Sequence, residues 1–292
     1  MNKKSLIFAV FYAVLAVVAC FSVGCSINDL IKIDYLIYEN ADEYFIGDKT
    51  YVNDGTITSV NVDWIIGNVT VKSGENFEIK ELFSGLGEAK KVRSAVINGE
   101  LKIKFWKSGY LDTCNKAAGE KDVEITVPNG IDLSLDGTSC AYVAKSINAK
   151  KLNIGLISGK FSSDEVVCES LICSLTSASF SVEKAEVFSA AELSSISGAL
   201  KIGEFSGKSL SFESTSGNVS VTLKNCEKLV AETINGKVNI NSGENGATVE
   251  FSTISGKLKA ESSYVVNGGK YVFGGGACKI SVETTSGWLT IK

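Results

Sequence analysis

The chain contains no histidine and only one proline among its 292 residues. Without histidine and without any Cys-x-x-Cys spacing, it lacks the usual ligand sets of a zinc site. It also has no cluster of lysine and arginine that could follow a phosphate backbone, and its net charge is -4. We therefore expect no zinc, no other cofactor and no nucleic-acid partner.

What the chain does have is a short repeated phrase, apolar-x-apolar-x-[Ser/Thr]-x-Ser-Gly-x-apolar-x-apolar, between Leu133 and Ile291. The turn in this phrase returns every 19 or 20 residues, and only the last step, from Gly256 to Gly287, is longer, at 31. A fixed period of this size predicts a stacked all-β solenoid, or β-helix, of about eight coils. The turn pairs are Ser139 and Cys140, Ser158 and Gly159, Ser177 and Ala178, Ser197 and Gly198, Ser216 and Gly217, Asn235 and Gly236, Ser255 and Gly256, and Ser286 and Gly287.

Apolar columns flank the turn. Because a strand sends alternate side chains to opposite faces, the residues two places after the turn glycine should stack inward from coil to coil. The positions between the apolar columns are mostly polar, as in Lys201 and Lys259, and should face outward. The inward column holds Tyr142, Phe161, Phe180, Leu200, Val219, Val238, Leu258 and Leu289.

The turns themselves are predicted to be structural corners. Glycine reaches positive φ without a Cβ clash, and a serine hydroxyl can bond nearby backbone groups. Serine at these positions is therefore not expected to act as a nucleophile. The corners carry serine where calcium-binding solenoids carry aspartate, so structural calcium is not expected either.

The N-terminus reads as a targeting segment. Two lysines precede a stretch from Ser5 to Asn28 that has no charged residue, which fits a signal sequence or a membrane helix. Cys20 and Cys25 each follow small residues and each resembles a bacterial lipoprotein box, with Cys25 slightly favoured. The alternative is an uncleaved helix of about 21 residues, long enough to cross a bilayer. Either way, we expect a protein anchored in the bacterial cell membrane with residues from Asp29 onward on the extracytoplasmic side.

The rest of the chain divides into three parts. We expect a spacer at 29–54, an N-terminal β region at 55–130 that caps the stack, and the solenoid repeats at 131–292. The single proline, Pro128, fits a strand end just before the first regular coil. Tyr264–Phe273 has the pattern of a β-hairpin that caps the C-terminal edge, with a protruding binding loop as the alternative.

Six cysteines follow the N-terminal segment. An exported protein favours disulfides, but the repeat register separates these residues. Cys168 and Cys226, for example, share a column and lie three coils apart, about 14 Å at the usual strand spacing. We therefore interpret the cysteines as small buried apolar residues. They are Cys114, Cys140, Cys168, Cys173, Cys226 and Cys278.

Taken together, these features resemble the bacterial putative-adhesin family, surface proteins built from β-strand repeats and catalogued as a domain of unknown function. The resemblance covers most of the chain after the N-terminal segment. It is carried by the repeat phrase and by Trp64–Gly67, Leu101–Phe105, Lys107–Gly109 and the closing Thr284–Ile291. It implies a β-solenoid displayed outside the membrane, but no ligand and no binding residues.

Two observations bear on function. Glu213 and Glu232 stand in one outward column on adjacent coils, about 4.8 Å apart at the backbone. This spacing suits a retaining glycosidase, whose carboxyl groups lie about 5–5.5 Å apart, but no aromatic or histidine accompanies the pair. Trp288 also faces outward, either as a ligand contact or, as we favour, as part of the terminal cap.

The sequence thus favours a non-enzymatic module that binds a cell-wall, host or peptide component through its flat ladder faces. The alternative is an envelope-stress sensor or a structural protein that holds partners at the membrane. A polysaccharide-active enzyme is a remote third alternative. The oligomeric state stays open.

Overall fold

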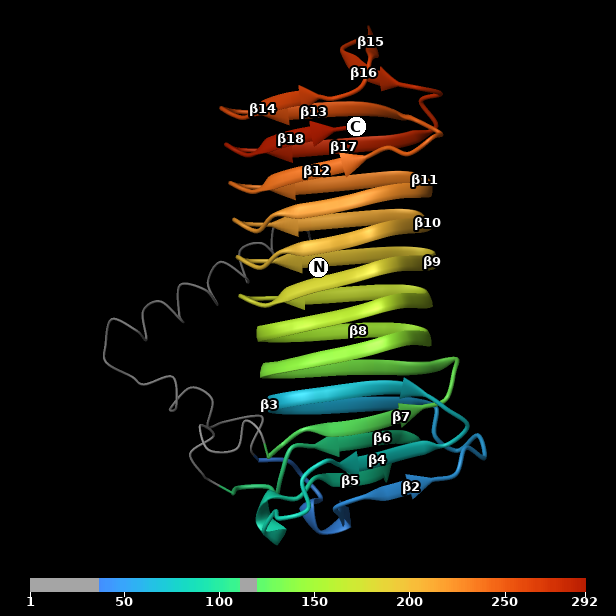
Figure 1. Cartoon of the computed structure of the whole chain (residues 1–292), viewed down its shortest axis with the longest axis vertical. Helices are drawn as coiled ribbons and strands as arrows, with labels where there is room; N and C mark the ends of the chain where they lie inside the picture. The colour runs from blue at the N-terminus through green and yellow to red at the C-terminus, as the bar shows by residue number, and fades with distance from the viewer. Residues whose placement is uncertain (1–36, 111–119) are drawn as a thin grey trace, which may run out of the picture.

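The computed structural model describes residues 37–110 and 120–292. These residues form an elongated stack of strands in two layers, with the chain advancing along the long axis (Figure 1). The N-terminal elements are η1 (Ala41–Glu43), β1 (Phe45–Ile46), β2 (Lys49–Tyr51), β3 (Ser59–Ser73), β4 (Phe77–Glu81), η2 (Glu88–Lys90), β5 (Arg93–Ile97), β6 (Glu100–Lys104) and β7 (Val123–Val127). The repeat region contains β8 (Ile131–Leu175), β9 (Ser179–Ser195), β10 (Leu200–Ser214), β11 (Val219–Thr233), β12 (Lys237–Asn241), β13 (Ala247–Thr253), β14 (Lys257–Ala260), β15 (Tyr264–Asn267), β16 (Lys270–Phe273), β17 (Cys278–Thr284) and β18 (Trp288–Ile291).

The proposed anchor, residues 1–28 with Cys20 and Cys25, lies outside the described residues. Within the described ranges, no helix has the length and apolar character needed to cross a membrane.

The predicted inward columns are confirmed. Strands β8, β9, β10 and β11 pair in parallel, and Phe161, Phe180, Leu200 and Val219 follow one another in register. Each of these four side chains is only 1 % exposed. The rings of Phe161 and Phe180 stack with centroids 5.3 Å apart and planes 11° from parallel. The repeat period therefore builds one continuous apolar core along the stack.

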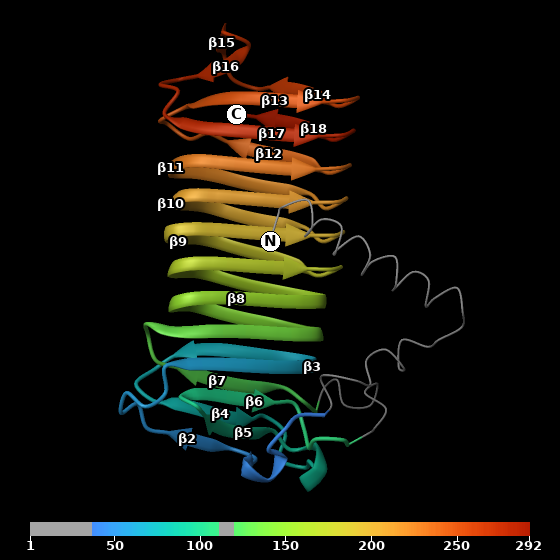
Figure 2. The ribbon, with the colours of Figure 1, turned by 180° about the vertical axis from the view of Figure 1, so that it is seen from behind.

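The stacking order at the C-terminal end differs from the chain order. The final coil, β17 and β18, lies between the coil of β11 and β12 and the coil of β13 and β14 (Figures 1 and 2). Ile280 of β17 is in register with Leu229 of β11 on one side and with Val249 of β13 on the other. Leu289 of β18 is likewise flanked by Val238 and Leu258. We call β17 and β18 the inserted coil.

The long last step of the repeat makes this insertion possible. After β14, the chain forms the predicted hairpin, which pairs Tyr264 with Phe273 in antiparallel register. Strand β16 then runs antiparallel along β13, with Val249 opposite Tyr271, before the chain enters β17. The hairpin prediction is thus confirmed, and β16 covers the outer edge of β13, a protection that limits pairing with other chains.

Antiparallel strands also cover the N-terminal end. Strand β3 forms a coil in parallel register with β8, for example Val60 with Leu133. Strands β6 and β7 pair with β3 in parallel, and β5 and β4 then pair with them in antiparallel fashion. Strands β1 and β2, within the stretch expected to be a spacer, add to β5 and β4.

A buried ion pair fixes this N-terminal region. The Lys121 ammonium donates hydrogen bonds to Glu81 Oε1 at 2.8 Å and to the Lys90 carbonyl at 2.7 Å. It lies 5.1 Å from the ring centroid of Trp64, whose indole N–H donates to the Lys121 carbonyl at 3.0 Å. Burial lowers the pKa of Lys121, although Glu81 partly opposes the shift.

Candidate functional site

A hydroxyl three residues before five of the six corner glycines explains the Ser/Thr position of the repeat; Leu156 stands there before Gly159. The Gly217 N–H donates to Ser214 Oγ at 2.8 Å, which closes the turn inside the core. The same bond links Gly198 to Ser195, Gly236 to Thr233, Gly256 to Thr253 and Gly287 to Thr284. These hydroxyls therefore serve as turn acceptors.

The glycines are needed for close approach between coils. A Cβ on Gly217 would lie 2.0 Å from the carbonyl oxygen of Gly198 in the neighbouring coil, far inside van der Waals contact. Among the six corner glycines, Gly159 alone has a positive φ, 105°, so the prediction of positive φ is wrong for the other five. A comparable clash, at 1.5 to 2.2 Å, would occur at Gly159, Gly198, Gly236, Gly256 and Gly287.

The corner serines bond along the stack. Ser197 Oγ donates to the Thr176 carbonyl at 3.3 Å, and Ser216 Oγ donates to the Ile196 carbonyl at 3.2 Å. These bonds tie the corners at Ser197 and Ser216 to the preceding coil. Ser158, Asn235, Ser255 and Ser286, also predicted as corner residues, occupy the same position on their coils.

The type of residue before each corner serine or asparagine indicates where the inserted coil stacks. Backbone hydrogen bonds link these positions from coil to coil. Stacked in space, they alternate strictly between isoleucine and threonine, whereas the chain order brings Ile234 and Ile254 together. Only the insertion of Thr285 between these two restores the alternation. The stacked series is Ile157, Thr176, Ile196, Thr215, Ile234, Thr285 and Ile254.

The insertion places Trp288 between two other coils on a ladder face, on the coil next to the end of the stack. It is in register with Lys237 on one side and Lys257 on the other. The indole is 50 % exposed, and Lys257 Nζ lies 5.8 Å from its ring centroid. Because the coil of β13 and β14 lies beyond it, Trp288 is not in the terminal coil, and the favoured assignment to the cap is wrong.

Polar and basic residues surround this indole. The next outward column holds Asn239, Thr290 and Lys259, in register across the same three coils. Lys259 pairs with Glu261 at 3.0 Å. No carboxylate stands in either column on these coils, and within the described part of the chain neither Lys237 nor Lys257 forms an ion pair. We call these six residues the tryptophan face. They are Trp288, Lys237, Lys257, Asn239, Thr290 and Lys259.

The tryptophan face can bind a planar, anionic ligand. An exposed indole offers a flat apolar surface with a single N–H donor. The flanking ammonium groups can pair with carboxylate, sulfate or phosphate. A sugar ring that carries an acidic group fits both features.

The other layer carries a ladder of glutamates. Glu213 and Glu232 are in register, as predicted, and the inserted coil adds Glu283 beside Glu232. All three are exposed, so no difference in burial separates an acid from a nucleophile among them. This glutamate ladder can attract cationic groups.

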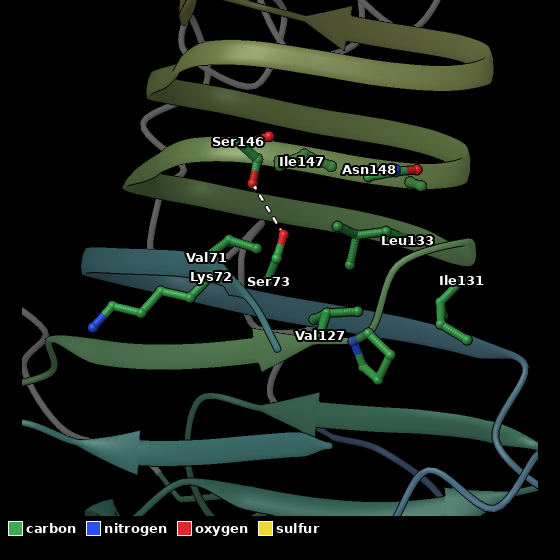
Figure 3. Close-up of a pocket in the computed structure, with 11 residues that line it drawn as sticks. Val71, Lys72, Ser73, Val127, Ile131, Leu133, Ser146, Ile147 and Asn148 are labelled. Atoms are coloured by element: carbon green, nitrogen blue, oxygen red, sulfur yellow. Dashed lines mark hydrogen bonds between the residues drawn. The ribbon is translucent and has the colours of Figure 1, made fainter. Parts of the chain in front are cut away.

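Two hollows lie near the ends of the stack. The pocket in Figure 3, between Val71, Val127 and Leu133, holds about 10 Å³, at most one water. An open hollow of about 650 Å³ lies at the C-terminal end between Phe251, Leu258, Tyr264 and Tyr271. The first hollow is a packing seam at the junction of β3, β7 and β8, and the second is where the last coil leaves its apolar side partly uncovered.

The fold defines an all-β solenoid with parallel strands and antiparallel ends. The chain belongs to the Toastrack DUF4097 family, whose sequence profile matches residues 53–292. This confirms the resemblance inferred from the repeat. No curated protein matches the chain.

Three solved structures align with most of the chain at low sequence identity. A putative adhesin from Bacteroides fragilis is 14% identical, with 85% of this chain and 97% of that chain covered and a TM-score of 0.48. A putative cell adhesion protein from Clostridium sporogenes is 12% identical, with 85% and 99% covered and a TM-score of 0.26. A putative lipid binding protein from Parabacteroides distasonis is 13% identical, with 84% and 97% covered and a TM-score of 0.46.

Proposed function

We propose that this protein is a non-enzymatic surface module that binds an anionic carbohydrate polymer through the tryptophan face. The observation that carries the proposal is the exposed indole of Trp288 between two lysines that have no ion-pair partner among the described residues. The parallel ladder repeats its backbone about every 4.8 Å, so a long polymer can lie along it over several coils.

A binding assay with the full-length chain tests this proposal. We expect saturable binding to a polyuronate, no binding to a neutral glucan of equal length, and weaker binding as salt rises, because exposed charges are screened. Trp288→Ala should weaken binding about tenfold or more, as for a central aromatic anchor. Phe188→Ala is the matched control, since this aromatic is similarly exposed, at 54 %, on another part of the solenoid. Equal binding to both polymers, or equal loss in both variants, would contradict the proposal.

The glutamate ladder supports a second candidate function, the sensing of cationic peptides under envelope stress. Three stacked carboxylates, Glu213, Glu232 and Glu283, repel one another, and a cationic peptide would relieve this repulsion. In this case, a cationic peptide should bind and the polyuronate should not. Glu232→Gln should then weaken peptide binding. Trp288→Ala should leave peptide binding unchanged.

The membrane anchor is part of the proposal. We propose that residues 1–28 hold the solenoid on the extracytoplasmic side of the bacterial membrane, through a lipid on Cys25 or Cys20 or as a single span. Metabolic labelling with a fatty acid separates these routes. Loss of the label in Cys25→Ala supports lipidation of Cys25. Loss of the label only in Cys20→Ala supports lipidation of Cys20. Membrane retention without any label supports a membrane-spanning helix.

A further inference from the structure

The inserted coil brings together two cysteines that are far apart in the chain. Parallel pairing of β11 with β17 begins at Lys228 and Lys279. Cys226 lies two residues before the first of these, and Cys278 lies one residue before the second. Adjacent strands about 4.8 Å apart with an offset of one residue place the two Cα atoms about 6 Å apart. This separation is within the range of disulfides, about 4.4–6.8 Å.

The side chains meet as the backbone register suggests. The two thiols interact, and this interaction raises the pKa of Cys226 and lowers that of Cys278. The Cys226 sulfur also lies 3.3 Å from the Lys228 carbonyl oxygen. Cys278 is buried, whereas Cys226 is partly exposed and can meet a reagent from solvent. The expectation that the register separates all the cysteines is therefore wrong for this pair.

The other described cysteines lack these features. Cys140, Cys168 and Cys173 are buried. Burial raises the pKa of Cys140 and of Cys168 to about 12, and that of Cys173 further, which disfavours the reactive thiolate. Among the described residues, only this pair combines proximity with a partly exposed thiol, that of Cys226, and a thiol whose pKa is lowered, that of Cys278.

We propose that Cys226 and Cys278 are a redox-sensitive pair that forms a disulfide between β11 and β17. With a small-molecule disulfide as the oxidant, Cys226 passes its proton to the Cys278 thiolate and attacks the disulfide to form a mixed disulfide. The released thiolate of the oxidant takes this proton from Cys278 and leaves as a thiol. The Cys278 thiolate then attacks the Cys226 sulfur and displaces the second thiol. Both cysteine protons are lost, the pair is oxidised by two electrons, and the oxidant is reduced to two thiols.

This disulfide holds the inserted coil in place. It closes a loop that contains β12 to β16 and links the inserted coil, which carries Trp288, to the regular stack. Closing a long loop restricts the unfolded chain. The inference does not rest on the proposed function, because it concerns only the stability of the coil.

The test uses the native full-length chain and glutathione disulfide. After oxidation without denaturant, free thiols are alkylated and the chain is digested for peptide mapping. We expect a peptide pair joined through Cys226 and Cys278, while Cys140, Cys168 and Cys173 stay reduced until the chain is unfolded. Oxidation should raise Tm by about 10 °C, and a reducing agent should reverse the rise. The map also resolves Cys20, Cys25 and Cys114, which lie outside the described residues.

Variants make the assignment specific. Cys226→Ser should fold, because this side chain is partly exposed, and should lose the oxidant-dependent rise in Tm. Cys168→Ala is the matched control, which removes a cysteine three coils away and should keep the rise. Stable glutathione adducts on Cys226 alone, free alkylation of both residues after oxidation, or a rise in Tm that persists in Cys226→Ser would overturn the proposal.

Discussion

The corner glycines allow a sharp test of the packing between coils. In Gly217→Ala, the new Cβ would lie 2.0 Å from the Gly198 carbonyl oxygen, whereas ordinary contacts are about 3.5 Å or longer. The two corners must therefore separate by more than 1 Å, by this comparison. That movement strains two backbone bonds, from Thr215 N–H to the Ser195 carbonyl at 3.1 Å and from Ser216 N–H to the Ile196 carbonyl at 2.9 Å.

The cost follows from these contacts. Two weakened backbone hydrogen bonds, at about 1 kcal/mol each, and the overpacking of a tight corner should lower the free energy of unfolding by about 3 kcal/mol. For a domain of this size, this lowers Tm by about 6–12 °C. Thermal unfolding followed by far-UV circular dichroism measures the shift.

Gly87→Ala provides the matched control. No atom lies within 4 Å of the added Cβ, and the backbone of Gly87 has φ of -61°, which alanine adopts readily. This variant should be neutral or slightly more stable. A Gly217→Ala chain as stable as the control would refute the explanation that close approach demands the corner glycines.

Three further predictions concern the core and its charges. Val219→Asp buries an unpaired charge in the packed column and should unfold several coils, while Lys259→Asp, at a side chain that is 67% exposed, should leave Tm nearly unchanged; equal damage from both would contradict the register. Lys121→Met leaves the Glu81 carboxylate buried without its cation and should lower the free energy of unfolding, measured by chemical denaturation, by about 3–5 kcal/mol. Adding Glu81→Gln should recover part of that loss. Burial raises the pKa of Asp136, despite hydrogen bonds from Ser134 and Asn61 that oppose the shift. The folded state therefore keeps this proton to higher pH than the unfolded state, and stability falls as pH rises above about 3.8 through the raised pKa. Asp136→Asn should remove that part of the pH dependence, and an unchanged profile would contradict it.

The repeat columns were predictable because burial depends on strand alternation, a local property of the sequence. Phe161, Phe180 and Val219 could be assigned to the core from their spacing alone. The position of the inserted coil could not be obtained in this way, since it depends on which open edge the returning chain fills. The repeat spacing predicts which residues share a column, but it does not predict the order in which the coils stack.

The candidate site depends on that same non-local step. Trp288 could be placed on an outward column from the sequence, but its neighbours Lys237 and Lys257 follow only from the stacking order. The same holds for Glu283 beside Glu232 and for Cys278 beside Cys226. The alternation of isoleucine and threonine at the corners is the one sequence signal that indicates the order.

The most direct test of the tryptophan face is acrylamide quenching of tryptophan fluorescence with and without a polyuronate. Trp64 and Trp106 are 1% and 2% exposed, so Trp288 is the indole that the quencher can reach. If the face binds the polymer, quenching should fall as the polyuronate is added and should not change with a neutral glucan. Undiminished quenching of Trp288 at saturating polyuronate would show that this face is not the binding site.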